Sequence, residues 1–476
     1  MSRRKRPLPL YENIEITAAA AEGKCIARVD DKVIFIPFTA PGDVVDVQIV
    51  KKRKSYLEGR VTNFHTYSDQ RRDPVCKHFG LCGGCKWQHL SYENQLINKQ
   101  KQVVDNFERI AKVSIGDTLP ILGCDEEYYY RNKLEYTFSN RRWLTNLDAP
   151  KEEGGPQNTN GLGFHLPGMF DKILDIEHCH LQKDPSNDIR LFVKEYADNH
   201  DLDFYSAREH EGFLRNLLIR TSTTNDLMVI VVFKYDDLDV AEMMEAISVK
   251  FPEITSLMYV INEKGNDTIW DLEIRTYKGN PYLIEEMISP IEGNDKLKFK
   301  VGPVSFYQTN PEQAYRLYKT AYDFADLRGE ELVYDLYTGT GTIADFIAGS
   351  AKKVIGIESV EQAIEDAKEN SDLNNISNTE FFAGDMLKIL TPEFIQEHGQ
   401  PDIIITDPPR AGMHEKVVLQ LLSTAAKKII YVSCNPATQA RDIELLSQKY
   451  DVVKIQPVDM FPQTNHVENV ALLHLR

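Results

Sequence analysis

Short apolar runs separated by turn residues make up the first part of the chain. They lie within the segments NIEITAAA, KCIARVDDKVIFIPF, APGDVVDVQIVKKR and LEGRVTNFHTY, between residues 11 and 66, and Glu-Gly, Asp-Asp or Pro-Gly pairs separate them. Runs of about four to eight residues between such pairs are typical of antiparallel strands. The pattern therefore predicts a small β-barrel at residues 1–66.

A helical pattern and a polar loop follow. Ser91 can cap a helix that extends to Ala111, because apolar side chains recur at intervals of three and four residues in this stretch. A polar, glycine-rich segment at residues 144–163 lies between apolar runs and predicts a surface loop. We assign residues 67–300 to an α+β middle domain, from which the helix at 91–111 can pack on the following domain.

From residue 301 onward, strand-like and helix-like stretches alternate. Asn310 and Pro311 predict the start of a helix, as N-cap and first helical residue. The strand candidates that follow are LVYDLY, KKVIGIE, TEFFAG, PDIIITD, KKIIYVS and VKIQPVDMF. The alternation predicts a parallel, doubly wound, Rossmann-like sheet at residues 301–476, with ligands at the carboxyl ends of its strands.

Length and composition restrict the class of protein. A chain of 476 residues is too long for one core and suggests two to four domains, and its 42% hydrophobic and 27% charged content is typical of a soluble globular protein. Together with the alternation above, this makes α/β multidomain the predicted fold class. The start MSRRKRPLPL is basic with no apolar segment behind it, so we expect no secretory signal, no membrane span and a cytoplasmic location. Seven cysteines favour thiol or metal chemistry over a disulfide framework.

Charge is distributed unevenly. The net charge of −17 disfavours a polyanionic partner, yet residues 1–60 hold 12 Lys and Arg against 8 Asp and Glu, a net charge of +4. Arg3–Arg6 and Lys51–Lys54 form the two basic clusters. A solvated surface is the simpler interpretation of either cluster alone. A basic loop on a barrel also suits contact with RNA phosphates.

A glycine-rich turn predicts a nucleotide-type cofactor. In DLYTGTGTIA, Gly339 and Gly341 follow an apolar run, and Ala344 takes the third small position of the motif. Glu358 ends the next strand candidate, where an acid can hydrogen-bond a ribose diol. ITDPPRAG then suits a nucleic-acid methyltransferase, with Asp407 as an acceptor at the mouth of the pocket. Arg410 stands where amino-group methyltransferases carry a stacking aromatic residue, which disfavours that chemistry.

A cysteine and an acid complete the candidate chemistry. Cys434 follows the KKIIYVS run, at the end where the cofactor binds. A single cysteine is more often a buried apolar side chain, but polar neighbours indicate a loop. Carbon 5 of uracil becomes nucleophilic only after a thiolate adds to carbon 6, and the carbon 5 proton must later leave. Glu468 is the candidate general base for that step.

Four further cysteines have metal-ligand spacing. Cys76, Cys82 and Cys85 form C-x5-C-x2-C, and Cys179 can supply a fourth thiolate. This spacing allows tetrahedral zinc as readily as an iron–sulfur cubane. Cys25 and Cys124 have no partners at useful spacing, so we expect them to be structural.

The chain resembles the bacterial uracil-C5 RNA methyltransferases that use S-adenosylmethionine, in particular the 23S ribosomal RNA branch with an N-terminal TRAM domain and an iron–sulfur cluster. The motifs that carry the resemblance span nearly the whole chain: the barrel, the cysteine group, YRNKLEYTF, LGFH, FYQTNPEQ, DLYTGTGT, DPPRAG, YVSCNPAT and DMFPQTNHVE.

The resemblance implies roles for individual residues. Cys434 is the implied nucleophile and Glu468 the base, while Phe306 stacks on RNA bases. It implies a [4Fe-4S] cluster on Cys76, Cys82, Cys85 and Cys179. It places Gln308 between the cofactor and the flipped uracil. The residues that it implies around S-adenosylmethionine, or where the cofactor meets the base, are Tyr337, Gly339, Thr342, Glu358, Asp385 and Asp407. A core aromatic beside the pocket is the alternative for Phe306.

The expected substrate is structured RNA, namely 23S ribosomal RNA before or during ribosome assembly, bound by a monomer. The same chemistry on a transfer RNA uridine, or on another ribosomal uridine, is the alternative within the class. A cytosine-C5 enzyme also needs a thiolate, but the family motifs favour uracil. A noncatalytic RNA-binding protein with an iron–sulfur or zinc centre would not need Gln308, Asp407, Cys434 and Glu468 together.

Overall fold

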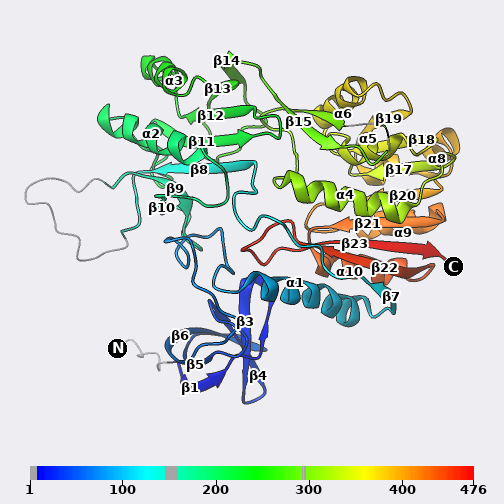
Figure 1. Cartoon of the computed structure of the whole chain (residues 1–476), viewed down its shortest axis with the longest axis horizontal. Helices are drawn as coiled ribbons and strands as arrows, with labels where there is room; N and C mark the ends of the chain where they lie inside the picture. Colours follow the sequence, from blue (N-terminus) through cyan, green and yellow to red (C-terminus); the bar gives the residue numbers. More distant parts are fainter. Residues whose placement is uncertain (1–7, 145–158, 292, 294–295) are drawn as a thin grey trace, which may run out of the picture.

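The computed structural model describes residues 8–144, 159–291, 293 and 296–476. Figure 1 shows three bodies: a blue barrel at the N-terminal end, a cyan-to-green middle body and a yellow-to-red body that ends at the C-terminus. The basic cluster Arg3–Arg6 and most of the predicted loop at 144–163 lie outside the described residues. The described helices include none that is long and apolar enough to cross a membrane.

The N-terminal barrel confirms the predicted strand runs. Its described strands pair in the order β1-β5-β6-β4-β3-β2 around a core that includes Ile34 and Val47. Gly42 has φ +92°, which explains the glycine in the turn before β5. Lys51–Lys54 are exposed where β5 turns into β6. The strands are β1 (Leu10–Glu15), β2 (Ala18–Ala19), β3 (Lys24–Val29), β4 (Lys32–Pro37), β5 (Val44–Lys52) and β6 (Tyr56–Thr66).

A long helix connects the barrel to the C-terminal sheet. Helix α1 (Tyr92–Asn106) begins after Ser91, whose hydroxyl accepts from the Asn94 amide as predicted, and a π-helical turn (Phe107–Ala111) extends it. Strand β7 (Ile115–Thr118) then pairs with strand β22 (Tyr450–Val458). Residues 91–118 therefore pack on the sheet of the C-terminal body although they precede the middle body in the chain.

The middle body is a sheet with two helices on one face. Its described strands take the order β10-β9-β8-β11-β12-β13-β14, and the main core lies between the sheet and helices α2 and α3. The strands are β8 (Lys133–Ser139), β9 (Gly161–His165), β10 (Ile173–Asp175), β11 (Leu214–Thr221), β12 (Leu227–Phe233), β13 (Ser256–Ile261) and β14 (Ile274–Gly279), and the helices are α2 (Ser186–Asn199) and α3 (Leu238–Lys250). The hairpin β15 (Leu283–Ile288) and β16 (Lys296–Val301) leads to the C-terminal body.

The C-terminal body is a doubly wound sheet in the order β19-β18-β17-β20-β21-β23-β22-β7, as far as the described residues show. One core joins one face of the sheet to α4, α5 and α6, and the other joins the opposite face to α1, α9 and α10. The elements are α4 (Pro311–Ala325), β17 (Leu332–Leu336), α5 (Thr342–Ala348), β18 (Lys353–Glu358), α6 (Glu361–Leu373), β19 (Thr379–Ala383), α7 (Met386–Ile389), α8 (Pro392–His398), β20 (Ile403–Thr406), α9 (Glu415–Thr424), β21 (Lys428–Ser433), α10 (Pro436–Leu446), β22 and β23 (Glu468–Leu475).

The prediction of a wholly parallel sheet is wrong at one edge. Strands β17 to β21 are parallel, but β23 lies between β21 and β22 and is antiparallel to both. A hairpin returns β22 directly into β23, and a short return connection can join only antiparallel strands. The last strand, shown in red in Figure 1, therefore lies inside the sheet, between β21 and β22.

Candidate active site and cysteine-lined cavity

The carboxyl ends of four parallel strands surround one cavity. It has a volume of about 550 Å³ and lies beyond the ends of β17, β18, β20 and β21, where ligands of such sheets bind. The predicted residues in its wall are Phe306, Gln308, Tyr337, Gly339, Thr342, Glu358, Asp407, Cys434 and Glu468. Of the residues that we expected around the cofactor and the base, only Asp385 is missing from this wall. Its carboxylate instead caps α7, accepting from the Leu387 amide at 2.9 Å.

The glycine turn leaves room for a ligand. Tyr337, Gly339 and Gly341 have φ values of +63°, +55° and +78°. A Cβ at Gly339 would meet no atom within 4 Å, whereas one at Gly341 would lie 2.9 Å from the Cβ of Ala367. Gly341 therefore allows close packing of the turn on the next helix, and Gly339 keeps its side of the cavity open.

Glu358 is held at the end of β18 by backbone amides. One carboxylate oxygen accepts from the Gly339 amide at 3.3 Å, and the other accepts from the Ser359 amide at 2.6 Å. These bonds orient the carboxylate toward the glycine turn. Its remaining lone pairs can accept hydrogen bonds from a ribose diol.

The antiparallel strand brings the thiol and the acid together. Ser433 at the end of β21 pairs with Asn469 of β23. Cys434 directly follows Ser433 and Glu468 directly precedes Asn469, so both residues lie at the same end of this pairing. Both side chains line the cavity, and Glu468 is 4% exposed. The two predicted reacting groups therefore face the same space.

Burial and charge determine the electrostatics of this space. Burial, with Glu468 and Asp407 nearby, raises the pKa of the Cys434 thiol to about 12. Burial raises the pKa of Asp407 to about 7, and burial together with Asp407 raises the pKa of Glu468 well above its usual range. Arg410 is the one cation among the described residues of the wall, and its charge lowers the pKa of both Cys434 and Glu468.

Gln308 and Phe306 belong to a segment that is tied to the middle body. Asn132 donates from its side chain to the carbonyl oxygen of Gln308 at 3.2 Å, and Arg220 donates to the carbonyl oxygens of Gly302 and Ser305. The Phe306 ring is 67% exposed at the rim of the cavity. This exposure excludes a core role and leaves the ring open to stacking on a base.

Several residues of the wall had no assigned role from the sequence, among them Tyr318, Phe461 and Arg410. Tyr318 belongs to the apolar stripe of α4, which gives no sign that it reaches a cavity. Phe461 lies in the turn between β22 and β23, and its position depends on that hairpin. Arg410 was noticeable only as a replacement for an aromatic residue. Its place directly after two prolines at the end of β20 is the signal that could have identified it.

The hairpin that precedes Glu468 is clamped by α1 and by the cysteine segment. Lys99 of α1 donates to the Asp459 carboxylate at 2.6 Å, and both side chains are fully buried. The carbonyl oxygen of Gln463 accepts from the amides of Lys86 and Trp87 at 2.9 Å each. The segment that contains Cys85 is thus bonded directly to the loop beside the active site.

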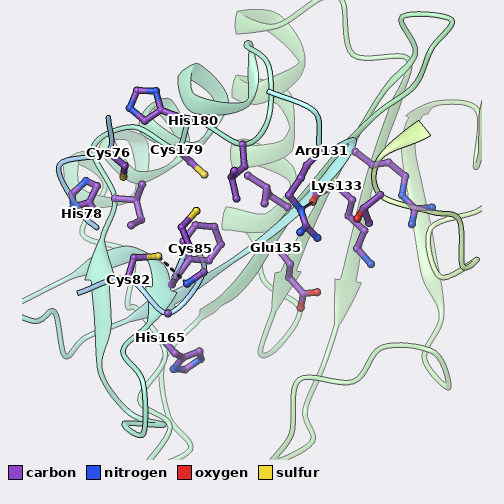
Figure 2. A pocket seen from close by; sticks show the side chains of 18 of the residues that line it. Cys76, His78, Cys82, Cys85, Arg131, Lys133, Glu135, His165, Cys179 and His180 are labelled. Carbon is purple, nitrogen blue, oxygen red and sulfur yellow. Dashed lines mark hydrogen bonds between the residues drawn. The ribbon is translucent and has the colours of Figure 1, made fainter. Parts of the chain in front are cut away.

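A second cavity contains the four predicted metal-ligating cysteines. Its volume is about 670 Å³, and its wall includes Cys76, Cys82, Cys85 and Cys179. Figure 2 shows the four sulfur atoms gathered at one side of this cavity, with His78 and His180 beside them. The structure therefore places Cys179 in the same cavity wall as the other three cysteines, across about ninety residues of chain.

The chemistry of the four thiols suits a cationic centre. Burial raises the pKa of all four, to about 11 for Cys82 and about 12 for Cys85. Such buried thiols lose their protons when a bound cation compensates the negative charge of the thiolates. Among the described residues, no three His, Cys, Asp or Glu side chains are close enough to bind a single metal ion.

The neighbouring histidines and the other two cysteines are bonded within the protein. The Tyr129 hydroxyl lies 3.2 Å from His178 Nε2 and 2.9 Å from His180 Nδ1, and His78 accepts from the Glu177 amide. The structural role expected for Cys25 and Cys124 agrees with their contacts. Cys25 donates to the Thr39 carbonyl oxygen in the barrel core, and Cys124 Sγ accepts from the Asn310 amide group.

Two family models match the chain. Residues 11–62 match the TRAM domain, and residues 280–476 match the family described as tRNA (Uracil-5-)-methyltransferase. The chain is 57% identical to an uncharacterized RNA methyltransferase of Bacteroides thetaiotaomicron, over 96% of this chain and all of that protein. It is 40% identical to an uncharacterized RNA methyltransferase of Chlorobaculum tepidum, over 96% of this chain and 95% of that protein.

A solved structure has the same overall fold. It is the tRNA (uracil-54, C5)-methyltransferase of Pyrococcus abyssi in complex with S-adenosyl-L-homocysteine. The TM-score is 0.73 at 27% sequence identity, and the alignment covers 97% of this chain and all of that chain. The likeness thus includes the barrel, the middle body and the C-terminal sheet.

Proposed function

Because the chain belongs to the uracil-C5 family of RNA methyltransferases, which use S-adenosylmethionine, we propose that it methylates carbon 5 of one uridine in 23S ribosomal RNA through a covalent bond to Cys434. The methyltransferase activity follows from the family. The target RNA and the covalent route rest on the arguments below.

Cys434 starts the proposed reaction. Its thiolate adds to carbon 6 of a uracil that has been flipped into the cavity, and the electrons of the carbon 5–carbon 6 bond move to form an enolate. The high pKa of Cys434 means that the thiol is protonated when the cavity is empty. Arg410 is the group that favours the thiolate, because its charge opposes that of the two nearby carboxylates.

Glu468 completes the reaction. S-adenosylmethionine supplies the methyl group that the enolate carbon takes up. The proton on carbon 5 then passes to the Glu468 carboxylate, the carbon 5–carbon 6 double bond forms again, and the bond from carbon 6 to Cys434 breaks to release the thiolate. Glu468 must be ionised for this step, and Arg410 again favours the charged form.

Residues of the cavity fit S-adenosylmethionine. Gly339 leaves open space beside the turn, and Glu358 offers fixed acceptor oxygens for a ribose diol. Gln308 and Asp407 line the same cavity as Glu358 and Cys434, and we propose that they contact both the cofactor and the base. Thr342 adds a hydroxyl to the wall. We propose no direct contact for Asp385, which lies outside the described wall and caps α7.

The four cysteines can hold a [4Fe-4S] cluster. They share one cavity wall, and their thiols would become thiolates on binding a cationic centre. Zinc also accepts four thiolates, and the family resemblance favours the cluster over zinc. We propose that the cluster braces the cysteine segment.

The observation that supports the proposal most is the pairing of β21 with β23, which brings Cys434 and Glu468 to the same end of the sheet in the cofactor cavity. A noncatalytic RNA-binding protein would not need this pair. Transfer RNA is the second candidate substrate, because the solved Pyrococcus abyssi enzyme and the matching family are named for it. The TRAM barrel and its exposed Lys51–Lys54 support a structured RNA in either case.

A mechanism-based trap tests both the chemistry and the target. Transcripts of 23S ribosomal RNA and of transfer RNA are made with 5-fluorouridine and incubated with the protein and S-adenosylmethionine. Fluorine cannot leave as a proton, so we expect an adduct at Cys434 that survives denaturation, and sequencing of the trapped RNA identifies the uridine. Cys434→Ser should form no adduct and no product. Full turnover by Cys434→Ser would refute the covalent route, and trapping of transfer RNA alone would refute the 23S target.

A further inference from the structure

The cysteine-lined cavity has a second end that the proposed reaction does not use. Figure 2 shows Arg131, Lys133 and Glu135 at and beside β8, across the cavity from the four cysteines. The wall at this end also includes Trp270 and Phe306. The mechanism gives no role to the polar groups or the tryptophan found here.

Trp270 is an exposed aromatic side chain that the protein holds in place. Its side chain is 75% exposed, although its neighbours Ile269 and Leu272 pack on an apolar core. Arg215, itself buried, donates to three backbone carbonyl oxygens of residues 262–266 and to the Asp267 carboxylate. The segment is therefore pinned on both sides of an aromatic ring that faces solvent.

Lys133 and Glu135 present polar groups in the wall of the same cavity as Trp270. They are two residues apart on β8, so they lie on the same face, about 7 Å apart along the strand. Neither side chain makes a hydrogen bond or an ion pair with another described residue. An ammonium donor and a carboxylate acceptor thus stand side by side in the wall, without a hydrogen-bond partner among the described residues.

The position of this end relative to the active site indicates what it binds. Phe306, Tyr307 and Thr309 line both cavities, so a single stretch of chain separates the two spaces. Arg220 holds this stretch by bonds to the carbonyl oxygens of Gly302 and Ser305. An RNA strand that places a uracil in the active site can therefore run past Phe306 into the cavity that Trp270 also lines.

We propose that Trp270, Lys133 and Glu135 form a binding site for a second unstacked nucleobase, from a nucleotide close to the target uridine in the strand. The proposal rests on the proposed function of the first cavity. Trp270 stacks on the face of the base, and the two charged groups read its edge. Guanine fits best, because one carboxylate can accept from its two neighbouring N–H donors while the ammonium donates to its O6.

Binding measurements test the stacking. The probe is the transcript that the wild-type protein methylates, 23S ribosomal RNA or, failing that, transfer RNA. Trp270→Ala should raise the Kd about 10-fold, because stacking on one aromatic ring is worth about that much affinity. Trp270→Phe should restore most of the affinity. Val249→Ala, which removes an exposed apolar side chain from α3, is the matched control and should bind as the wild type does.

Base replacement tests whether Lys133 and Glu135 recognise the edge of the base. Each nucleotide within a few positions of the methylated uridine is changed in turn, and kcat/KM is measured for the wild type and for Glu135→Gln. At one position the wild type should prefer guanine about 10-fold, and Glu135→Gln should lose that preference. Unchanged affinity of Trp270→Ala, or no base preference in the wild type, would overturn the second site. If the wild type methylates no RNA at all, the proposed function fails instead.

Discussion

At the scale of single residues, Cys434 and Glu468 have opposite tasks on the same ring. The thiol must lose its proton to begin the proposed reaction, and the acid must take one to end it. Burial raises the pKa of both, which favours the protonated form of each group in the empty cavity. Arg410 is the side chain in the wall that works against this effect for both groups. The two steps can therefore be separated by changing one residue at a time.

Glu468→Gln should stop the reaction after methyl transfer. The amide keeps the shape of the side chain but cannot accept the carbon 5 proton, so the methylated RNA stays bonded to Cys434. We expect turnover to fall by about 10²–10⁴-fold, the usual contribution of a general base. A denaturing gel with unmodified RNA should show an adduct that the wild type does not accumulate. Loss of turnover without any adduct would mean that Glu468 acts before methyl transfer.

Asp345 provides a test of pH dependence that does not involve the reaction. Burial raises the pKa of this carboxyl to about 7, so between its unfolded pKa near 4 and pH 7 the folded state keeps a proton that the unfolded state has released. Its contribution to stability is therefore fully present below about pH 4 and is lost as the pH rises through 7.

Asp345→Asn removes this titration and keeps an acceptor for the Ser371 hydroxyl. Measured by urea denaturation, the free energy of unfolding of the variant should improve relative to the wild type by up to about 4 kcal/mol between pH 4 and pH 8. The exposed control Asp323→Asn should change little over that range. A constant difference between Asp345→Asn and wild type would contradict the raised pKa.

At the scale of elements, helix α1 acts on a hairpin more than three hundred residues away in the chain. Its Lys99 is bonded to Asp459 and to the carbonyl oxygen of Phe461, and Tyr92 donates to the same aspartate. This buried network fixes the turn that leads into β23. The alignment of Glu468 with Cys434 therefore depends on an element outside the C-terminal domain that we assigned from the sequence.

Lys99→Met should destabilise the protein strongly, because it leaves the Asp459 charge buried without its partner. We expect a loss of about 3–5 kcal/mol in the free energy of unfolding. The double variant with Asp459→Asn should recover part of this loss, since no buried charge remains. Lys101→Met, which breaks the exposed pair with Asp105 on the same helix, should cost under about 1 kcal/mol. If both lysine variants lost the same free energy of unfolding, the buried Lys99–Asp459 pair would not be what holds the hairpin in place.

At the scale of the whole molecule, the cysteine cavity is connected to both proposed RNA-binding regions. The cysteine segment is bonded to Gln463 beside the active site, and its cavity extends to Phe306 and Trp270. Methyl transfer to an enolate needs no electron. We therefore expect the proposed metal centre to hold the parts of the molecule in position rather than to take part in the reaction.

Cys85→Ala should weaken folding and RNA binding together. After reconstitution with iron and sulfide, we expect the unfolding temperature to fall by about 5 °C or more and the Kd for RNA to rise. Thermal denaturation followed by circular dichroism and filter binding measure the two effects. Cys25→Ser is the control, since its hydroxyl can replace the thiol bond to Thr39. Intact folding and RNA binding with a selective loss of methyl transfer would argue against a positioning role.

The sequence by itself determined the features that depend on neighbouring residues. The barrel strands, the caps Ser91 and Asn310, and the glycine turn at 339–341 are governed by alternation, capping and backbone freedom, which are local properties. The position of Cys434 after a strand, at the ligand-binding edge of the sheet, follows from the same local pattern. The role of Glu468 was inferred from the chemistry of uracil and from family motifs.

Only the tertiary structure decided which distant segments meet. Strand β23 inserts antiparallel to β21, and this pairing brings Glu468 to the same end of the sheet as Cys434. Such pairing is decided across the sheet, and the sequence of β23 carries no periodic signal that distinguishes it from a parallel strand. The approach of Cys179 to the other cysteines, the clamp by Lys99, and the place of Trp270 near Phe306 depend on long-range packing in the same way. Local patterns specify elements, but contacts between elements specify the site.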